Sequence, residues 1–177
     1  MVSHTLISLL GFASMVLAQV ANINFYENDD LCRSGLFASC TNLPQNECCA
    51  LASNQLATCM DFATTTPNGI ATAFSSQAGN QCAVVLERLI SGVCVCPTGV
   101  PVISGGSWNT SETRQENGNK SCEKKVQPNA FGWSENDSTW MVYKEDNATY
   151  TNVAEAIANG TSKNDISKFI KNHGQEV

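Results

Sequence analysis

Histidine is almost absent from this chain of 177 residues. His4 and His173 are the only two, and His173 lies close to the C-terminal end. A serine or cysteine nucleophile activated by histidine would therefore depend on a terminal segment, where protein chains usually fray. We expect no catalytic triad, and a binding protein is favoured over an enzyme.

Zinc-binding cysteine patterns and nucleotide-binding loops are missing as well. Cys48 and Cys49 are adjacent, and a single residue separates Cys94 from Cys96, whereas zinc knuckles have gaps of two or more residues. The sequence has no glycine-rich loop of the phosphate-binding or dinucleotide-binding kind. We therefore expect no metal and no cofactor.

Basic residues are scarce, and long apolar runs are confined to the N-terminus. The chain has 10 Lys and Arg against 16 Asp and Glu, a formal net charge of −6. Nucleic acids and anionic membranes attract dense basic patches, so neither is expected as a partner. No stretch after residue 18 is apolar enough for a transmembrane helix, and no membrane span is expected.

A single apolar run opens the sequence. Residues 5–18 are nearly all apolar or small and uncharged, which is typical of the core of a signal peptide. Val16 and Ala18 supply the small residues that cleavage requires, so we expect a signal peptide over residues 1–18 and a secreted, extracellular protein. The alternatives are a buried N-terminal helix and a short membrane anchor. Both fit poorly, because the run is short and nine cysteines are unusual in a reducing compartment.

Cysteine is what the sequence has in abundance. Eight of the nine lie between residues 32 and 96, which predicts a disulfide framework. Cys48 and Cys49 should bond to separate partners, because a bond between neighbours is strained. One scheme pairs these eight and leaves Cys122 free or bonded to a second chain in a disulfide-linked dimer, whereas the other uses Cys122 and frees Cys59. The disulfide candidates are Cys32, Cys40, Cys48, Cys49, Cys59, Cys82, Cys94, Cys96 and Cys122.

Composition changes near Trp108. Residues 19–108 hold eight cysteines and few charges, whereas residues 109–177 hold one cysteine and frequent charges. We expect a cysteine-rich β domain (19–108) and a glycosylated extension (109–177) after the signal peptide. Acceptor sequences for N-glycosylation occur only in the extension, although a polar segment rich in Asn would also produce such matches. They begin at Asn109, Asn119, Asn136, Asn147 and Asn159.

Periodicity predicts strands first and helices last. Val20–Tyr26 alternates apolar and polar residues, as a half-buried strand does. Further strands are expected at residues 36–38, 83–86, 92–96 and 139–143, with residues 149–150 pairing with the last, and a short helix at residues 47–58. The expected fold class is mainly β, α+β overall: a disulfide-stapled Greek-key or sandwich-like core with a C-terminal helical hairpin.

Two apolar stripes at helical spacing predict the helical hairpin. Val153 and Ile157 are one helical turn apart, and Ile166, Phe169 and Ile170 share a face of a second helix. A glycine at position 160 suits the end of the first helix, and serine at position 162 with aspartate at 165 resembles a capping box. We expect the hairpin to dock on the cysteine-rich core.

Two catalytic or inhibitory alternatives remain open. A small carbohydrate-active hydrolase would need a carboxylate pair in an aromatic-lined cleft. The protein would be a protease inhibitor if residues 97–106, which hold two prolines near a disulfide, were presented rigidly, although an ordinary connection looks the same. Three of the available acids cluster in one turn, which is most simply a solvated loop: Glu27, Asp29 and Asp30. The other three are isolated in the sequence: Glu47, Asp61 and Glu87. The tryptophans, expected to be buried rather than stacked on sugar, are Trp108, Trp133 and Trp140.

The segment NINFYENDDLCRSGLFASCTNLPQNECC, residues 22–49, resembles the opening of fungal small secreted cysteine-rich proteins. In that group an aromatic strand and an acidic turn lead to a Cys-Cys pair. The segment is also similar to the first Greek-key motif of βγ-crystallin-like domains. However, its turn from Tyr26 to Gly35 is longer than that motif usually allows, and the calcium signature is missing, so calcium binding is not implied. The fungal resemblance implies an effector-like or surface-associated protein.

The function expected from the sequence is therefore extracellular binding or interaction without catalysis. The expected partner is an extracellular protein or a cell-wall polysaccharide.

Overall fold

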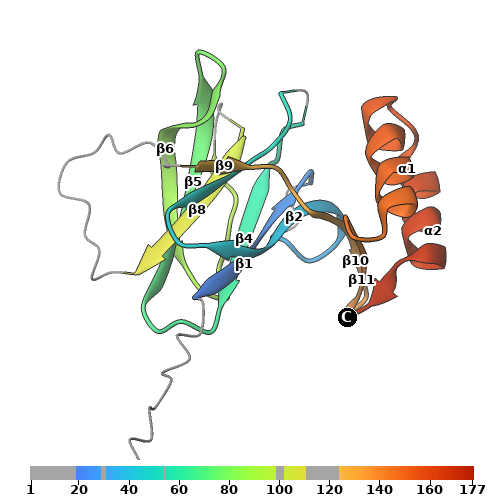
Figure 1. Cartoon of the computed structure of the whole chain (residues 1–177), viewed down its shortest axis with the longest axis horizontal. Helices are drawn as coiled ribbons and strands as arrows, with labels where there is room; N and C mark the ends of the chain where they lie inside the picture. Colours follow the sequence, from blue (N-terminus) through green and yellow to red (C-terminus); the bar gives the residue numbers. More distant parts are fainter. Residues whose placement is uncertain (1–18, 29–30, 54, 99–101, 111–123) are drawn as a thin grey trace, which may run out of the picture.

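The computed structural model describes residues 19–28, 31–53, 55–98, 102–110 and 124–177, which form two packed β-sheets followed by a pair of helices (Figure 1). The strands are β1 (Val20–Tyr26), β2 (Gly35–Pro44), β3 (Glu47–Ala50), β4 (Cys59–Thr64), β5 (Gly69–Gln77), β6 (Asn80–Ile90), β7 (Cys94–Val95), β8 (Gly105–Thr110), β9 (Lys124–Val126), β10 (Ala130–Glu135), β11 (Ser138–Tyr143) and β12 (Gln175–Glu176). The helices are α1 (Asn147–Ala158) and α2 (Lys163–His173).

Among the described residues the larger sheet has seven strands in the order β12-β11-β10-β2-β1-β4-β7, and the smaller has five in the order β6-β5-β8-β3-β9. The mainly β, sandwich-like core with a C-terminal helical hairpin is thus confirmed. No helix in the described part of the chain is long and apolar enough to cross a membrane.

The sandwich core follows from alternation along β1. Ile23 and Phe25 point toward the smaller sheet and are buried with Phe62 and Trp108, whereas Asn24 between them points to the opposite face. Trp108 is buried as expected, and its indole N–H donates a hydrogen bond to the Leu43 carbonyl oxygen (2.7 Å). Burial of these aromatic and aliphatic side chains is the main driving force for packing the two sheets.

The helical hairpin covers the rest of the same sheet face. Across the strands, Phe25 pairs with Ala38, Ala38 with Phe131, and Phe131 with Val142, so this row runs from the sandwich core to the helices. The buried helix residues that pack on it are Val153, Ile166 and Ile170. The hairpin therefore docks on β2, β10 and β11, as Figure 1 shows at its right side.

The ends of the two helices have the predicted chemistry. Gly160 has a φ of +69°, and its N–H and that of Thr161 bond to the carbonyls of Ile157 and Ala156, as in a Schellman motif. Ser162 precedes α2, and its hydroxyl oxygen accepts a hydrogen bond from the Asp165 backbone N–H. The capping residues thus fix where α1 ends and α2 begins.

The change in composition near Trp108 does not separate two sets of strands. β8 runs through residue 108, and β10 lies between β2 and β11 in the larger sheet. β9 pairs with β3 in the smaller sheet. Both sheets therefore contain strands from both parts of the chain.

Two local predictions are wrong. Residues 47–58 contain no helix among those described: β3 lies between β8 and β9, and Cys48 and Cys49 are fully buried there. Sheet pairing and two disulfides override the helix preference of the Ala- and Leu-rich sequence. Residues 149–150 belong to α1 rather than to a strand, because the Tyr150 ring stacks on Phe131 (centroids 5.0 Å apart) and its hydroxyl donates to the Pro128 carbonyl oxygen.

The described residues contain four disulfides, which link Cys32 to Cys94, Cys40 to Cys49, Cys48 to Cys82, and Cys59 to Cys96. Cys48 and Cys49 thus have separate partners. Cys59 is bonded, as in the scheme that pairs the eight clustered cysteines. Cys122 lies outside the described residues, so the disulfide-linked dimer stays a prediction that thiol counting and non-reducing mass measurement would check.

Candidate functional site

One face of the larger sheet is covered by neither the smaller sheet nor the helices, and we call it the open face. Residues paired across antiparallel strands point to the same side of a sheet. The register therefore places the polar residues of β1 in one row with their partners on the neighbouring strands. Asn24 is opposite Asp61 on β4 and Ser39 on β2, and Ala130 joins Ser39 to Tyr143. The open face is therefore polar where the inner face is apolar.

A second row on the open face is aromatic and apolar. Tyr26 pairs with Phe37, Phe37 with Gly132, and Gly132 with Met141. The Tyr26 and Phe37 rings lie 5.1 Å apart, and the Phe37 ring lies over Gly132, where an added Cβ would meet Phe37 Cζ at 2.1 Å. This row forms a small apolar wall beside the polar row.

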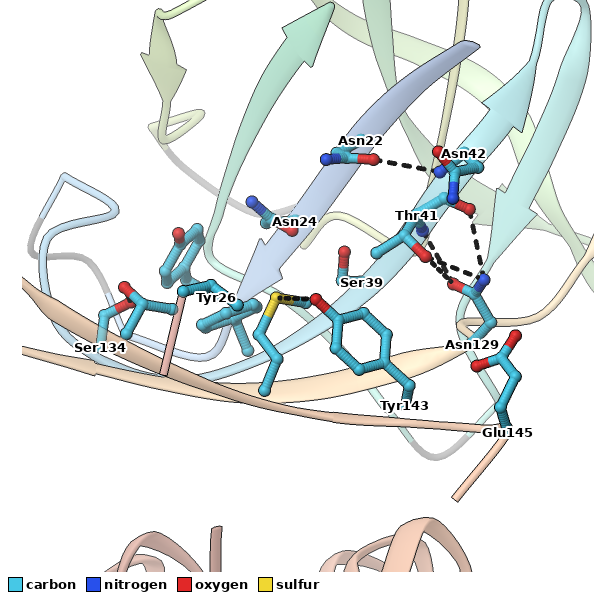
Figure 2. Close-up of a pocket in the computed structure, with 14 residues that line it drawn as sticks. Asn22, Asn24, Tyr26, Ser39, Thr41, Asn42, Asn129, Ser134, Tyr143 and Glu145 are labelled. Carbon is cyan, nitrogen blue, oxygen red and sulfur yellow. Dashed lines mark hydrogen bonds between the residues drawn. The ribbon is translucent and has the colours of Figure 1, made fainter. Parts of the chain in front are cut away.

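The polar row and the wall border a cavity of about 500 Å³, which we call the open-face pocket (Figure 2). Along it β10 contributes the small residues Ala130, Gly132 and Ser134 between larger side chains on β2 and β11, and Ser134 lines the cavity. The lining residues are Asn22, Asn24, Tyr26, Phe37, Ser39, Thr41, Asn42, Asn129, Ser134, Thr139, Met141, Tyr143, Glu145 and Val177.

A bulge shapes the rim of the pocket. Ala21 pairs with Leu43 but Ile23 with Cys40, so β2 carries one extra residue opposite Asn22. At the bulge Asn42 has a φ of +55°, and its N–H donates to Asn22 Oδ1 (3.0 Å). Figure 2 shows these two asparagines at the same end of the pocket.

Asn129 holds the other side of the rim through its side chain. Its Oδ1 accepts a hydrogen bond from the Thr41 N–H (2.8 Å), and its Nδ2 donates to the Thr41 carbonyl oxygen (3.2 Å). With these two bonds the Asn129 side chain satisfies the backbone N–H and carbonyl of Thr41, as a paired strand would, just before β10 begins at Ala130. The amide and hydroxyl groups of the rim are thereby held in fixed positions.

Asp61 is the acid next to the polar row. Asn24 Nδ2 donates to its Oδ1 (2.8 Å), and the Tyr26 hydroxyl donates to its Oδ2 (3.0 Å). Burial raises the pKa of Asp61 above its ordinary value of 3.8, and the two hydrogen bonds offset only part of that rise. The carboxyl group positions Asn24 and Tyr26 while its own proton is held more tightly than in water.

We expect Asp61→Asn to change how stability depends on pH. A raised pKa in the folded state favours the protonated form, so the contribution of Asp61 is complete below pH 3.8 and is lost as the pH rises through the raised pKa. Thermal unfolding of both proteins between about pH 3 and pH 8 should show the wild type losing stability relative to the variant as the pH rises. If the difference in stability between the wild type and Asp61→Asn stays constant with pH, this role of Asp61 is wrong.

Two disulfides support the end of the open face. Cys59 is directly opposite Tyr26, and Cys94 is opposite Asp61. The Sγ atoms of Cys94 and Cys96 are 3.9 Å apart, so the Cys32–Cys94 and Cys59–Cys96 bonds lie side by side. Cys32, Cys59 and Cys94 have the spacing of a sulfur cluster that could bind a metal, but their sulfurs are held in disulfides.

The other acids considered from sequence lie elsewhere. Glu27 pairs with Lys163 (3.0 Å), Glu47 pairs with Lys124 (3.0 Å), and Glu87 is exposed on β6. Asp29 and Asp30 lie outside the described residues. Asp61 is the member of that set beside the pocket, while Glu145, a lining residue, was not among the sequence candidates.

Three of the glycosylation acceptors are exposed where elements begin or end: Asn136 between β10 and β11, Asn147 at the start of α1, and Asn159 at its end. Asn109 is half-buried in β8, and Asn119 lies outside the described residues.

Residues 103–106 of the loop considered for protease inhibition are buried. Ile103 is completely buried and pairs with Ala57, and Gly105 and Gly106 belong to β8. Residues 99–101 lie outside the described residues.

Sequence reasoning missed most of the pocket. The alternation of residues 20–26 placed Asn22 and Asn24 on the polar side of a strand, which was the available signal. Nothing in the local sequence showed that Ser39, Thr41 and Tyr143 would join them, because the register between distant strands decides that.

Fold and pocket together define a cysteine-rich β-sandwich protein with one open, polar sheet face. Residues 22–129 match a family model described as ARB_05566_N, N-terminal domain, and this span is more than half of the chain. The chain therefore belongs to that family. No curated protein and no solved structure matches it. The match ends at Asn129, so the pocket combines residues of the family domain with residues of β10 and β11 that follow it.

Proposed function

We propose that this chain is a secreted, effector-like or surface-associated glycoprotein that binds a neutral polysaccharide of a cell wall or host surface through the open-face pocket. The observation that carries the proposal is the lining: a wide hollow with amide and hydroxyl side chains, the half-buried ring of Tyr143 and the almost fully buried rings of Tyr26 and Phe37. Sugars offer hydroxyl groups that both donate and accept, and C–H faces that pack on aromatic rings.

The charge of the pocket favours a neutral ligand. Glu145 is a lining residue with an exposed carboxylate side chain. A polyanionic ligand would be repelled by Glu145 and by the net charge of −6. An extracellular protein partner is less well supported, since protein interfaces are usually centred on exposed apolar and aromatic groups, whereas polar side chains occupy much of this pocket.

Several features support an extracellular setting. Four disulfides are rare in a reducing compartment. The apolar run at residues 5–18 is typical of a signal peptide, and Asn136, Asn147 and Asn159 are exposed enough to accept glycans.

The test is binding of the full chain to neutral hexasaccharides of β-1,3-glucan, β-1,4-glucan and β-1,4-mannan, measured by calorimetry. We expect one of them to bind, and Asn22→Ala/Asn24→Ala to weaken binding at least about ten-fold through lost hydrogen bonds. The matched control is Asn152→Ala/Asn172→Ala, which removes two exposed asparagines from the helices and should bind normally. If no hexasaccharide binds, or if both double variants bind alike, the proposal is wrong.

The hydrolase alternative has one observation in its favour, the raised pKa of Asp61. The second carboxylate at the pocket is Glu145, just beyond β11. β4 and β11 are separated by four strand spacings of about 4.8 Å, or about 19 Å along the sheet. Glycosidases hold their two carboxyl groups roughly 5–10 Å apart. We therefore favour binding, and sugar release from the same hexasaccharides would reverse that preference.

A further inference from the structure

One hydroxyl group in the open-face pocket is buried without a partner. Ser39 is fully buried, and its Oγ makes no hydrogen bond to the described residues. A buried polar group without a partner destabilises a protein by about 1–3 kcal/mol, and native structures keep such groups mainly where they have a use. Ser39 sits in the middle of the polar row, between Asn24 and Ala130.

A second hydroxyl in the same pocket has a poor partner. The Tyr143 hydroxyl donates to the Met141 Sδ atom (3.4 Å), and a thioether is a weak acceptor. Tyr143 and Ser39 are both directly opposite Ala130, a small and fully buried residue, and both line the pocket. Figure 2 shows the Tyr143 hydroxyl joined to the methionine sulfur by this hydrogen bond, with Ser39 in the same pocket.

We propose that Ser39 and Tyr143 form a subsite that binds one hydroxyl group of a neutral sugar. Until the sugar binds, the Met141 thioether takes the place of that hydroxyl as the acceptor for Tyr143. This inference rests on the proposed function and names the groups that select the ligand. A sugar hydroxyl accepts a hydrogen bond from Tyr143 Oη and donates one to Ser39 Oγ. Both protein hydroxyls then exchange a weak or missing partner for an O–H···O bond.

The arrangement favours a hydroxyl over an anion. Carboxylate and phosphate oxygens accept hydrogen bonds but do not donate, so they would use Ser39 and Tyr143 only as donors. Glu145 lines the same pocket and would repel them. A deoxy sugar would leave Ser39 without a partner, so the subsite discriminates against it.

Three conservative variants separate recognition from structure. Ser39→Ala removes the unpartnered hydroxyl, so it should leave the unfolding midpoint unchanged or raise it, yet weaken the best-bound neutral hexasaccharide about 5- to 10-fold. Tyr143→Phe keeps the ring and should weaken binding similarly. Met141→Leu removes the competing sulfur acceptor and should improve affinity. A purely structural role would instead lower stability and affinity together in all three.

A direct readout comes from ¹³C-methyl-labelled methionine in the full chain. The hexasaccharide should shift the Met141 methyl signal, while Met60, fully buried in the sandwich core, serves as the reference that does not move. If the wild type binds but Ser39→Ala and Tyr143→Phe bind equally well, or if the Met141 signal stays in place, the subsite is wrong and the proposed function survives. If the wild type binds none of the three hexasaccharides, both are wrong.

Discussion

Replacing Cys59 and Cys96 together by alanine is expected to lower the free energy of unfolding by about 4 kcal/mol. The bond between them closes a sequence separation of 37 residues, so its loss returns considerable entropy to the unfolded chain. Cys59 is completely buried and packs with Tyr26, Phe37, Ala130 and Met141 beside the pocket. The variant should therefore also bind sugar less tightly. Denaturant unfolding monitored by tryptophan fluorescence measures the first effect.

The matched control is Cys40→Ala/Cys49→Ala. This bond spans only 9 residues and links β2 to β3 on the inner side of the sandwich. Its loss should lower the free energy of unfolding by about 2.5 kcal/mol and spare sugar binding at the residual stability. An equal loss of stability in the two double variants, or a larger one in the control, would contradict the assigned disulfides.

Gly132→Ala is expected to lower the free energy of unfolding by about 2–3 kcal/mol, at the upper end of overpacking costs. The added methyl group would stand 2.1 Å from Phe37 Cζ, far inside van der Waals contact. Phe37 is almost fully buried and packs on Tyr26, so its ring has little room to move aside. The displaced ring should narrow the open-face pocket, and thermal unfolding together with calorimetry would measure both changes.

Two further variants isolate the clash. In Gly132→Ala/Phe37→Leu the smaller side chain at position 37 makes room, so the two substitutions together should cost less than the sum of each alone. Gly79 has a φ of +80°, and a methyl group added there would meet nothing within 4 Å. Gly79→Ala therefore tests backbone strain alone and should lower the free energy of unfolding by about 1 kcal/mol. If Gly132→Ala is no worse than Gly79→Ala, the close approach of Phe37 is not a constraint.

The elements that local sequence specifies were predictable. Strict alternation identified β1 with its true bounds, because one of its faces is apolar and the other polar. Apolar stripes at helical spacing identified the helical hairpin, and Gly160 and Ser162 marked the end of the first helix and the start of the second. Cysteine density indicated the disulfides, since few other uses of eight clustered cysteines fit a sequence with this apolar leader.

The features that depend on distant pairing were not predictable. Residues 47–58 look helical by composition, but β8, β9 and two disulfides hold residues 47–50 as a strand. The pocket requires β10 to insert beside β2, which brings Tyr143 into one row with Ser39 and Asn24. No local pattern encodes that register, so neither the open-face pocket nor the unpartnered hydroxyl of Ser39 could be foreseen.

The central claim is that the open face holds a neutral sugar. The most direct test is a ¹⁵N NMR titration of the full chain with the three neutral hexasaccharides, following every backbone and asparagine side-chain amide. The account predicts that shifts concentrate on Asn22, Asn24, Thr41, Asn129 and Tyr143, which line the pocket from four separate segments. Shifts confined to the helices or to the smaller sheet, or no shifts with any of the three sugars, would contradict it.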